Sequence, residues 1–131
     1  MFRITASLVC AAALLGSIPA IPALAQPTVV DLDRAVRCSA AFGIVAAQQA
    51  RGAKGAQDYP PLGQRGREFF VQTGARLMDE QKLTREQVQA RMRAEVQKLQ
   101  TEAAASADPG AAMRGIMTPC LALLDAVMPV K

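Results

Sequence analysis

The chain contains no histidine, which excludes several kinds of catalytic site. Ser-His-Asp and Cys-His sites need an imidazole base, and zinc sites of the His-Glu-x-x-His type need imidazole ligands. Carboxylates remain as candidate acid–base groups or cation ligands, in the pairs Asp31 with Asp33 and Asp79 with Glu80. Helical residues one or two positions apart do not converge on one point. We therefore interpret these acids as helix-end charges and expect no catalytic residues and no enzyme activity.

Sulfur supplies a second candidate chemistry. Met113, Met117 and Cys120 share one face at helical spacing, and soft sulfur ligands of this kind can hold Cu(I). Methionine also fills irregular gaps in protein cores. We expect these residues to be core, with no cofactor, and keep Met113 and Met117 as an alternative metal site.

Basic side chains and a tyrosine flank a loop rich in glycine and proline, residues 52–61. They are Arg51, Lys54, Tyr59, Arg65 and Arg67. Together they could contact an anionic lipid headgroup or an acidic polymer, although exposed basic residues beside a loop are also common as plain solvated surface. The formal net charge of the whole chain is only +4 at pH 7, without the concentrated basic face of a nucleic-acid-binding protein. We expect no nucleic-acid partner.

The N-terminus has the three parts of a secretory signal. Arg3 supplies the positive charge, residues 8–15 are an unbroken apolar run, and Ala23-Leu24-Ala25 supplies small residues at the cleavage site. The apolar run is well short of the roughly 20 residues needed to span a bilayer. We predict that residues 1–25 are a cleaved signal peptide.

Cleavage leaves residues 26–131 as a single small helical domain, and no other stretch looks long and apolar enough to cross a membrane. We expect no transmembrane segment in the mature chain. The predicted location is the periplasm or, alternatively, the medium.

Two cysteines remain after removal of the signal, Cys38 and Cys120. In an exported protein such a pair predicts a disulfide, although a bond between two chains or two free thiols are alternatives. Closing so large a loop would stabilise the fold by about 4–5 kcal/mol in the chain-entropy model. We predict an intramolecular bond that joins the first helix to the last.

Apolar residues recur at helical spacing in four segments, and no segment has a pattern that predicts a β-strand. The first two predicted helices cover residues 29–51 and 61–81, and the third starts at its cap Thr84 and fades in the alanines before Asp108. The fourth segment opens at Asp108 and is expected as a short helix to about Met117 and a second one from Pro119 to about Val127. Short connections between them favour an all-α, largely antiparallel four-helix bundle.

Capping residues mark the helix starts. Thr28 is a suitable N-cap for the first helix, Thr84 with Gln87 has the spacing of a capping box, and Asp108 precedes a proline at a first-turn position. Pro119 lies inside the last segment, where it removes one hydrogen bond and crowds the preceding turn. We predict that the last helix is broken or kinked at Pro119.

Three short motifs carry a resemblance. They are Arg37-Cys38-Ser39-Ala40-Ala41-Phe42, Tyr59-Pro60-Pro61-Leu62 and Pro119-Cys120-Leu121-Ala122-Leu123-Leu124-Asp125. Taken together, they resemble small exported helical proteins of alphaproteobacteria. The resemblance implies an exported helical protein in such a cell and implies no activity.

These observations favour a binding role. A small helical domain without an assembled catalytic constellation is typical of a protein that binds another component of the cell envelope through a helical surface. A metal- or lipid-handling module that uses the methionine face or the basic loop is the alternative. The specific partner and the oligomeric state stay open.

Overall fold

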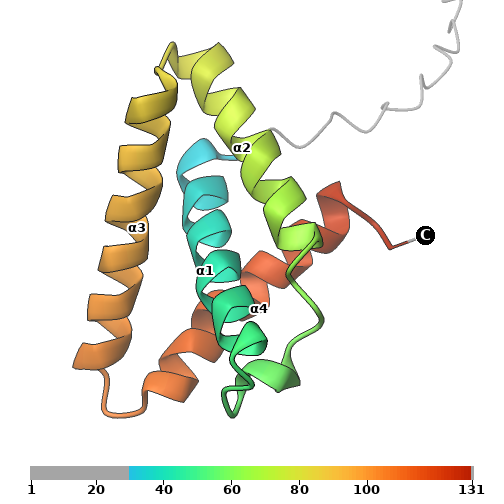
Figure 1. The fold of residues 1–131 in the computed structure, drawn as a ribbon, viewed down its shortest axis with the longest axis vertical. Helices are drawn as coiled ribbons and strands as arrows, with labels where there is room; N and C mark the ends of the chain where they lie inside the picture. Colours follow the sequence, from blue (N-terminus) through green and yellow to red (C-terminus); the bar gives the residue numbers. More distant parts are fainter. Residues whose placement is uncertain (1–29, 131) are drawn as a thin grey trace, which may run out of the picture.

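The computed structural model describes residues 30–130, so the predicted signal peptide and the predicted N-cap Thr28 lie outside the described residues. The elements in chain order are α1 (Leu32–Ala50), the short 3₁₀ helix η1 (Ala56–Asp58), α2 (Arg65–Gln81), α3 (Arg85–Ala105) and α4 (Pro109–Val127). This part of the chain contains no strand, which confirms the all-helical prediction (Figure 1).

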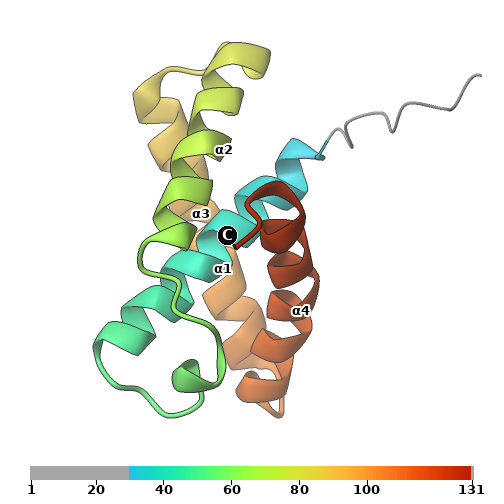
Figure 2. The same cartoon turned by 90° about the vertical axis from the view of Figure 1, so that its right-hand side faces the viewer.

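Helix α1 lies at the centre of the molecule and contacts each of the other three α-helices. Helices α2 and α3 form a hairpin that closes at Lys82, and the two helices spread apart away from that turn (Figure 1). Helix α4 crosses the opposite side of α1 at an oblique angle (Figure 2). The domain therefore has three layers, with α1 between the α2–α3 hairpin and α4, and α3 also contacts α4 directly.

Three helix starts follow from capping. Asp31 caps α1 by accepting a hydrogen bond from the Asp33 amide at 3.1 Å, so the helix begins at Leu32, three residues later than predicted. At α3 the predicted capping box is confirmed, with Thr84 and Gln87 bonded reciprocally at 2.8 and 3.2 Å. Asp108 caps α4 through the Ala111 amide at 2.9 Å, as its sequence position indicates.

Helix α2 starts at Arg65 and not at Pro61 as predicted. The reason is Gln49, near the end of α1, whose side chain forms hydrogen bonds with backbone groups of the loop before α2. Its amide nitrogen donates to the carbonyls of Ala56, Tyr59 and Pro60, and its oxygen accepts from the Leu62 amide. These bonds hold the loop against α1, and the first helical turn forms only after them.

The predicted break of the last helix at Pro119 is wrong, because α4 is one continuous helix from Pro109 to Val127. Residues on both sides of the proline, Met117, Cys120 and Leu124, are buried in the core. Tertiary packing supplies most helical stability in proteins and here outweighs the local preference of proline.

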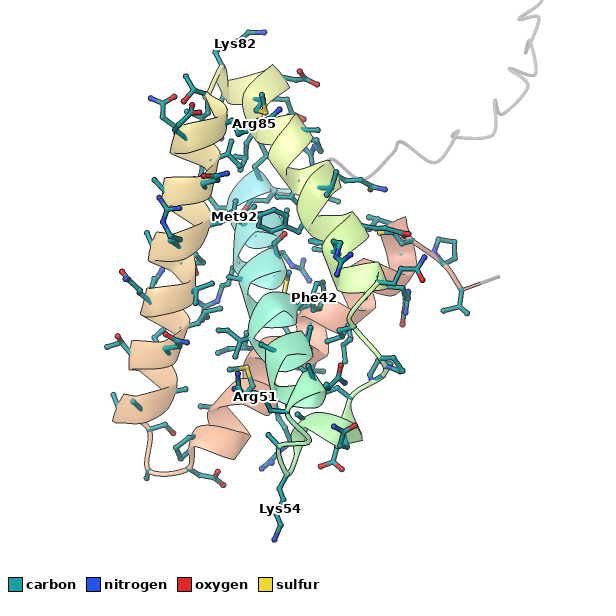
Figure 3. All side chains as sticks on the ribbon, viewed as in Figure 1. Phe42, Arg51, Lys54, Lys82, Arg85 and Met92 are labelled. Carbon is teal, nitrogen blue, oxygen red and sulfur yellow. A yellow bond between two sulfur atoms is a disulfide. The ribbon has the colours of Figure 1, made fainter. Side chains whose placement is uncertain are left out.

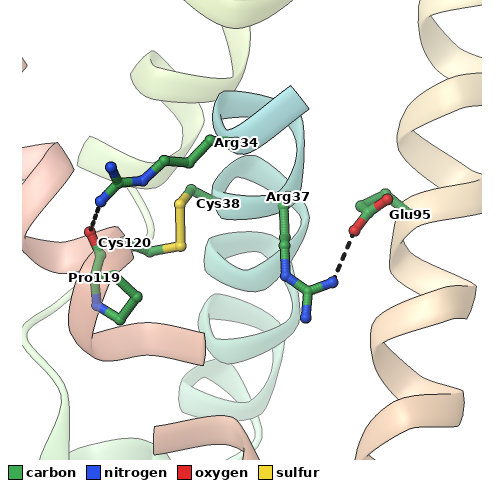
Figure 4. The surroundings of a disulfide bond; sticks show 6 residues. All are labelled: Arg34, Arg37, Cys38, Glu95, Pro119 and Cys120. Carbon is green, nitrogen blue, oxygen red and sulfur yellow. Dashed lines mark hydrogen bonds and ion pairs between the residues drawn. A yellow bond between two sulfur atoms is a disulfide. The ribbon is translucent and has the colours of Figure 1, made fainter. Parts of the chain in front are cut away.

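The predicted disulfide between Cys38 and Cys120 is confirmed. It joins α1 to α4 across a sequence separation of 82 residues, with the two Cα atoms 5.2 Å apart. Beside it, the Arg34 guanidinium donates to the Pro119 carbonyl at 3.3 Å (Figure 4). The bond ties together the two layers that are most distant in the sequence.

The main core surrounds this bond, with fully buried side chains from every layer. Phe42 and Phe69 meet edge to face with their ring centroids 5.3 Å apart. Close approach of α2 to α1 depends on Gly66, because a Cβ there would lie 3.1 Å from that of Phe42. A second cluster near the hairpin contains Leu32, Val36, Leu77, Val88 and Met92.

By length and composition, α4 is apolar enough to cross a membrane, a condition that we expected no segment after the signal to meet. Core helices of soluble proteins satisfy the same condition. Packing of Met117, Cys120 and Leu124 in the core accounts for part of the apolar composition of α4.

Candidate functional site

An open groove runs along α1 on the side away from α4. It consists of two cavities of about 420 and 360 Å³ that share Ser39, Gly43 and Phe70. We call this surface the α1 groove. Its lining residues are Ser39, Ala40, Phe42, Gly43, Ala46, Ala50, Leu62, Gly63, Gly66, Arg67, Phe70, Gln89, Met92, Arg93, Val96 and Gln97.

The α1 groove has a floor of small residues and walls from two different helices. Ser39, Ala40 and Gly43 lie on α1, while α2 and α3 diverge on either side of them (Figure 1). Gly43 is exposed, and a Cβ added there would have no described atom within 4 Å. The middle of α1 is therefore open to close approach from outside.

Ser39 carries an unsatisfied hydroxyl at the floor of this groove. The residue is 2% exposed, and its Oγ has no hydrogen-bond partner within residues 30–130. A buried polar group without a partner costs about 1–3 kcal/mol, so such groups are rare in folded proteins. A ligand atom at this position would supply the missing partner.

The charge of the α1 groove has one sign. Arg67 on α2 and Arg93 on α3 are the charged residues of its lining, and acidic residues are absent from it. Neither arginine forms an ion pair or hydrogen bond with another described residue. Phe70, which is 39% exposed, adds an apolar surface on the α2 wall.

Another cavity of about 420 Å³ lies at the end of the molecule that contains the loop, and we call it the loop cavity. Its lining combines the end of α1, the loop with η1, the last turn of α3 and the first turns of α4. Lys54, Tyr59 and Met113 from the sequence prediction all line it, together with Asp58 and Arg114. Burial raises the pKa of the Tyr59 phenol, and the positive charge of Arg114 opposes that increase.

The five residues predicted as a basic-loop site do not form one site in the structure. Lys54 and Tyr59 line the loop cavity, and Arg67 lines the α1 groove instead. Arg65 is bound to the Asp125 carboxylate at 2.8 Å and to the Met128 carbonyl at 2.7 Å. Arg51 is the exposed C-cap of α1, and it lies with Lys54 at the end of the molecule opposite Lys82 (Figure 3).

The sulfur residues are mostly used by the core. Met117 is fully buried, and the Cys120 sulfur is bonded to that of Cys38. Met113 packs against the core cluster and lines the loop cavity. The described residues contain no group of three His, Cys, Asp or Glu side chains placed to hold a metal ion.

The acidic pairs serve separate structural roles. Asp31 caps α1, while Asp33 is paired with Arg91 of α3. Glu80 forms an ion pair with Arg76 at 2.8 Å within α2, and its neighbour Asp79 is exposed. The members of each pair therefore point to different partners.

A separate line of ion pairs joins α1 to α3. The Arg37 guanidinium contacts the Glu95 carboxylate at 3.1 Å (Figure 4). It also contacts the Glu102 carboxylate at 2.5 Å. The hydrogen bond from Arg37 lowers the pKa of Glu102, and desolvation of the carboxylate opposes that decrease. These contacts fix α3 along α1 on one edge of the molecule.

The sequence prediction missed the α1 groove. Its signal was the pair of small residues Ser39 and Gly43, one turn apart within a helix that is otherwise apolar and alanine-rich. We interpreted this stretch only as part of a helix that packs into the core.

Comparisons with known protein families, with curated proteins and with solved structures found no significant match to this chain.

Proposed function

We propose that this chain is an exported, non-enzymatic protein that binds another protein of the cell envelope through the α1 groove. The observation that carries the proposal is the groove itself, which has a buried unpaired hydroxyl at its floor and two unpaired arginines on its walls. A surface that a protein does not use seldom contains a buried donor without a partner.

Export is supported by the predicted signal and, weakly, by the disulfide, because disulfides persist mainly in oxidising compartments. The proposed location is the periplasm or the medium of a bacterium, and the resemblance to exported alphaproteobacterial proteins agrees with it. In the same proposal the mature chain has no transmembrane segment. The four helices form a largely antiparallel bundle, in which Pro119 bends the continuous α4.

The absence of enzyme activity is also part of the proposal. Asp31 and Asp108 are helix caps, while Asp33, Glu80, Glu95 and Glu102 are occupied by arginine partners. Acid–base catalysis needs carboxylates with perturbed pKa values that converge on one cleft. The lining of the α1 groove contains no carboxylate. Asp31, Asp33 and Glu95 do line another cavity of about 440 Å³, but Asp31 is a helix cap there, and Arg91 and Arg37 pair with Asp33 and Glu95.

The experiment places a photoreactive p-benzoylphenylalanine in the α1 groove in the native cell. Replacement of Gln97 puts it on the groove wall, and replacement of the exposed Ala122 on α4 provides the matched control. We expect a discrete cross-linked partner, identified by mass spectrometry, from position 97 and not from position 122. Identical adducts from both positions, or none, would contradict a binding role of the groove.

A filled groove sharpens this test. Gly43→Leu places a side chain in the α1 groove, where no described atom within 4 Å obstructs its Cβ, so the fold should tolerate it. Gly115→Leu on α4 is the matched control, because Gly115 is equally exposed, helical and unobstructed. We expect Gly43→Leu to abolish the cross-link and Gly115→Leu to preserve it.

The loop cavity favours a second function, the binding of an anionic headgroup. Lys54 and Arg114 line it beside the Tyr59 phenol. Asp58 lies in the same lining and would repel an anion, which makes this function the weaker proposal. Calorimetric titration with anionic vesicles, and with Cu(I) for the Met113 and Met117 alternative, should give heat if either ligand binds.

A further inference from the structure

The shape of the α1 groove restricts what can occupy it, and this inference rests on the proposed function. We infer that the occupant is an amphipathic helix of the partner protein that carries acidic side chains along both edges of its apolar face. The acidic edges would meet Arg67 and Arg93, and the apolar face would rest on α1.

The first argument is the open side of α1. Helices α2, α3 and α4 pack around α1, and the side between α2 and α3 is left uncovered (Figures 1 and 2). Packed helices lie about 8–10 Å apart, and the shorter distances require small residues at the contact. Ser39, Ala40 and Gly43 provide such a contact, so a helix can approach α1 closely.

The second argument is charge. The two arginines stand on opposite walls, Arg67 on α2 and Arg93 on α3, and both lack a partner among residues 30–130. Arginines 37, 65, 76 and 91 are each paired with a carboxylate within 3.1 Å, whereas Arg34, Arg51 and Arg85, which lie outside the groove lining, have no carboxylate partner among the described residues. A helix with carboxylates on both edges would complete the same kind of pair at the groove.

The third argument is the Ser39 hydroxyl. It is nearly completely buried, lines both cavities of the α1 groove and has no partner in the described structure. Close contact between two helices over small residues brings polar atoms of the second helix within reach of such a hydroxyl. The hydroxyl therefore points to an occupant with hydrogen-bonding atoms on its contact face.

A fatty acid is the rival with the same chemistry, since it combines an apolar chain with a carboxylate. Ligand sites of that kind usually enclose 70–90% of the ligand in a pocket. The α1 groove is open along α1 instead, and its arginines lie on two walls, whereas a fatty acid has one carboxylate. Both features favour a helix.

The test uses two labelled helical peptides of about 18 residues, roughly 27 Å long, and the whole mature chain. Both have an apolar face of alanine and leucine; one has glutamate along both edges of it, and the other has lysine. Fluorescence anisotropy at low salt should show about tenfold or more tighter binding of the glutamate peptide, because two opposite-charge contacts are replaced by repulsion in the other peptide.

Charge reversal provides the decisive arm. In the double variant Arg67→Glu and Arg93→Glu, the preference should invert toward the lysine peptide. Reversal of two exposed residues outside the groove lining, Lys54→Glu with Lys82→Glu, is the control and should leave the order of the two peptides unchanged. Equal affinities of the two peptides for the wild type would overturn the inference. So would a preference for the glutamate peptide that persists in the Arg67→Glu and Arg93→Glu double variant.

Ser39→Ala and sodium oleate test the other two arguments. Loss of one hydrogen bond should weaken binding of the glutamate peptide about 2- to 10-fold, without lowering the thermal midpoint of the free protein. Tight binding of oleate with no binding of either peptide would overturn the helix in favour of a fatty acid.

The two proposals can fail separately. If Gly43→Leu blocks the cellular cross-link but the peptides show no charge preference, the acidic helix is wrong and the binding function stands. If the cross-link is unaffected by Gly43→Leu, the α1 groove is not the binding surface and both proposals fail.

Discussion

The two sides of α1 are built in contrasting ways. On the α4 side, Cys38 is covalently bonded to Cys120, and Met117 and Leu124 are completely buried around that bond. On the groove side, Gly43 leaves an open space, Phe70 is 39% exposed and the Ser39 hydroxyl lacks a partner in the described chain.

The contrast suggests that the two sides of α1 have different roles, stability on the α4 side and binding on the groove side. Burial of apolar side chains stabilises the fold on both sides of α1, whereas the disulfide restricts the unfolded chain through the α4 side alone. A margin of stability on that side allows the other to keep features that cost free energy, such as an unsatisfied serine. Binding surfaces commonly combine such costs with a rigid scaffold.

The largest expected effect comes from removal of the bond between α1 and α4. Reduction of the disulfide, or the pair Cys38→Ser and Cys120→Ser, should lower the free energy of unfolding by about 4–5 kcal/mol because the loop constraint on the unfolded chain is lost. Urea unfolding with and without dithiothreitol measures it. The double variant should not respond to dithiothreitol, and an equal midpoint for reduced and oxidised wild type would contradict the structural role.

The next comparison truncates one side chain on each side. Leu124→Ala on the α4 side should cost about 2–5 kcal/mol, because Leu124 is fully buried and leaves a cavity. Phe70→Ala on the groove side should cost about 1–2 kcal/mol despite the larger side chain, because much of the ring is already in contact with water. Equal losses in urea unfolding would show that the two sides are equally packed.

A smaller effect of opposite sign is expected at Ser39. Replacement by alanine removes an unsatisfied buried hydroxyl and should keep or raise the free energy of unfolding, by up to about 1 kcal/mol. Thr73→Ala, at a buried threonine of α2 whose hydroxyl is not a buried unsatisfied group, is a comparison at a site outside the groove lining. A clear loss of stability in Ser39→Ala would mean that the hydroxyl has a partner in the free protein.

The smallest effect concerns pH and the ion pairs between α1 and α3. The hydrogen bond from Arg37 places the pKa of Glu102 below its ordinary value of 4.5. Since the folded pKa is lower than the unfolded one, the stabilising contribution is complete above about pH 4.5 and is lost as the pH falls through the folded value. Carboxyl NMR titration should show the Glu102 pKa rising toward its ordinary value in Arg37→Gln, and no rise would refute the contact.

Local chemistry made part of the fold predictable. The Thr84–Gln87 capping box and the Asp108–Pro109 start were recognisable because each cap involves residues within one turn. The bond between Cys38 and Cys120 followed from their number and the predicted export.

Features that depend on tertiary contacts were not predictable in the same way. Pro61 has the local character of a helix start, but Gln49 binds the adjacent loop and delays α2 to Arg65. Pro119 has the local character of a break, but burial of the residues around it keeps α4 continuous.

The α1 groove belongs to the same class of features. It exists because α2 and α3 diverge from their hairpin, and the angle between two helices is not encoded in the pattern of either one. Of the five residues in the predicted basic-loop site, Arg67 alone became a groove residue, and Ser39 and Gly43 were interpreted only as parts of a core helix.

The most direct measurement of the binding surface is an amide NMR titration of labelled residues 26–131, the predicted domain, with the glutamate-edged peptide. The account predicts shifts within residues 39–43, 66–70 and 89–97, and an undisturbed α4 from residue 115 to 126. Shifts centred on α4, or none at peptide concentrations that saturate the anisotropy signal, would contradict it.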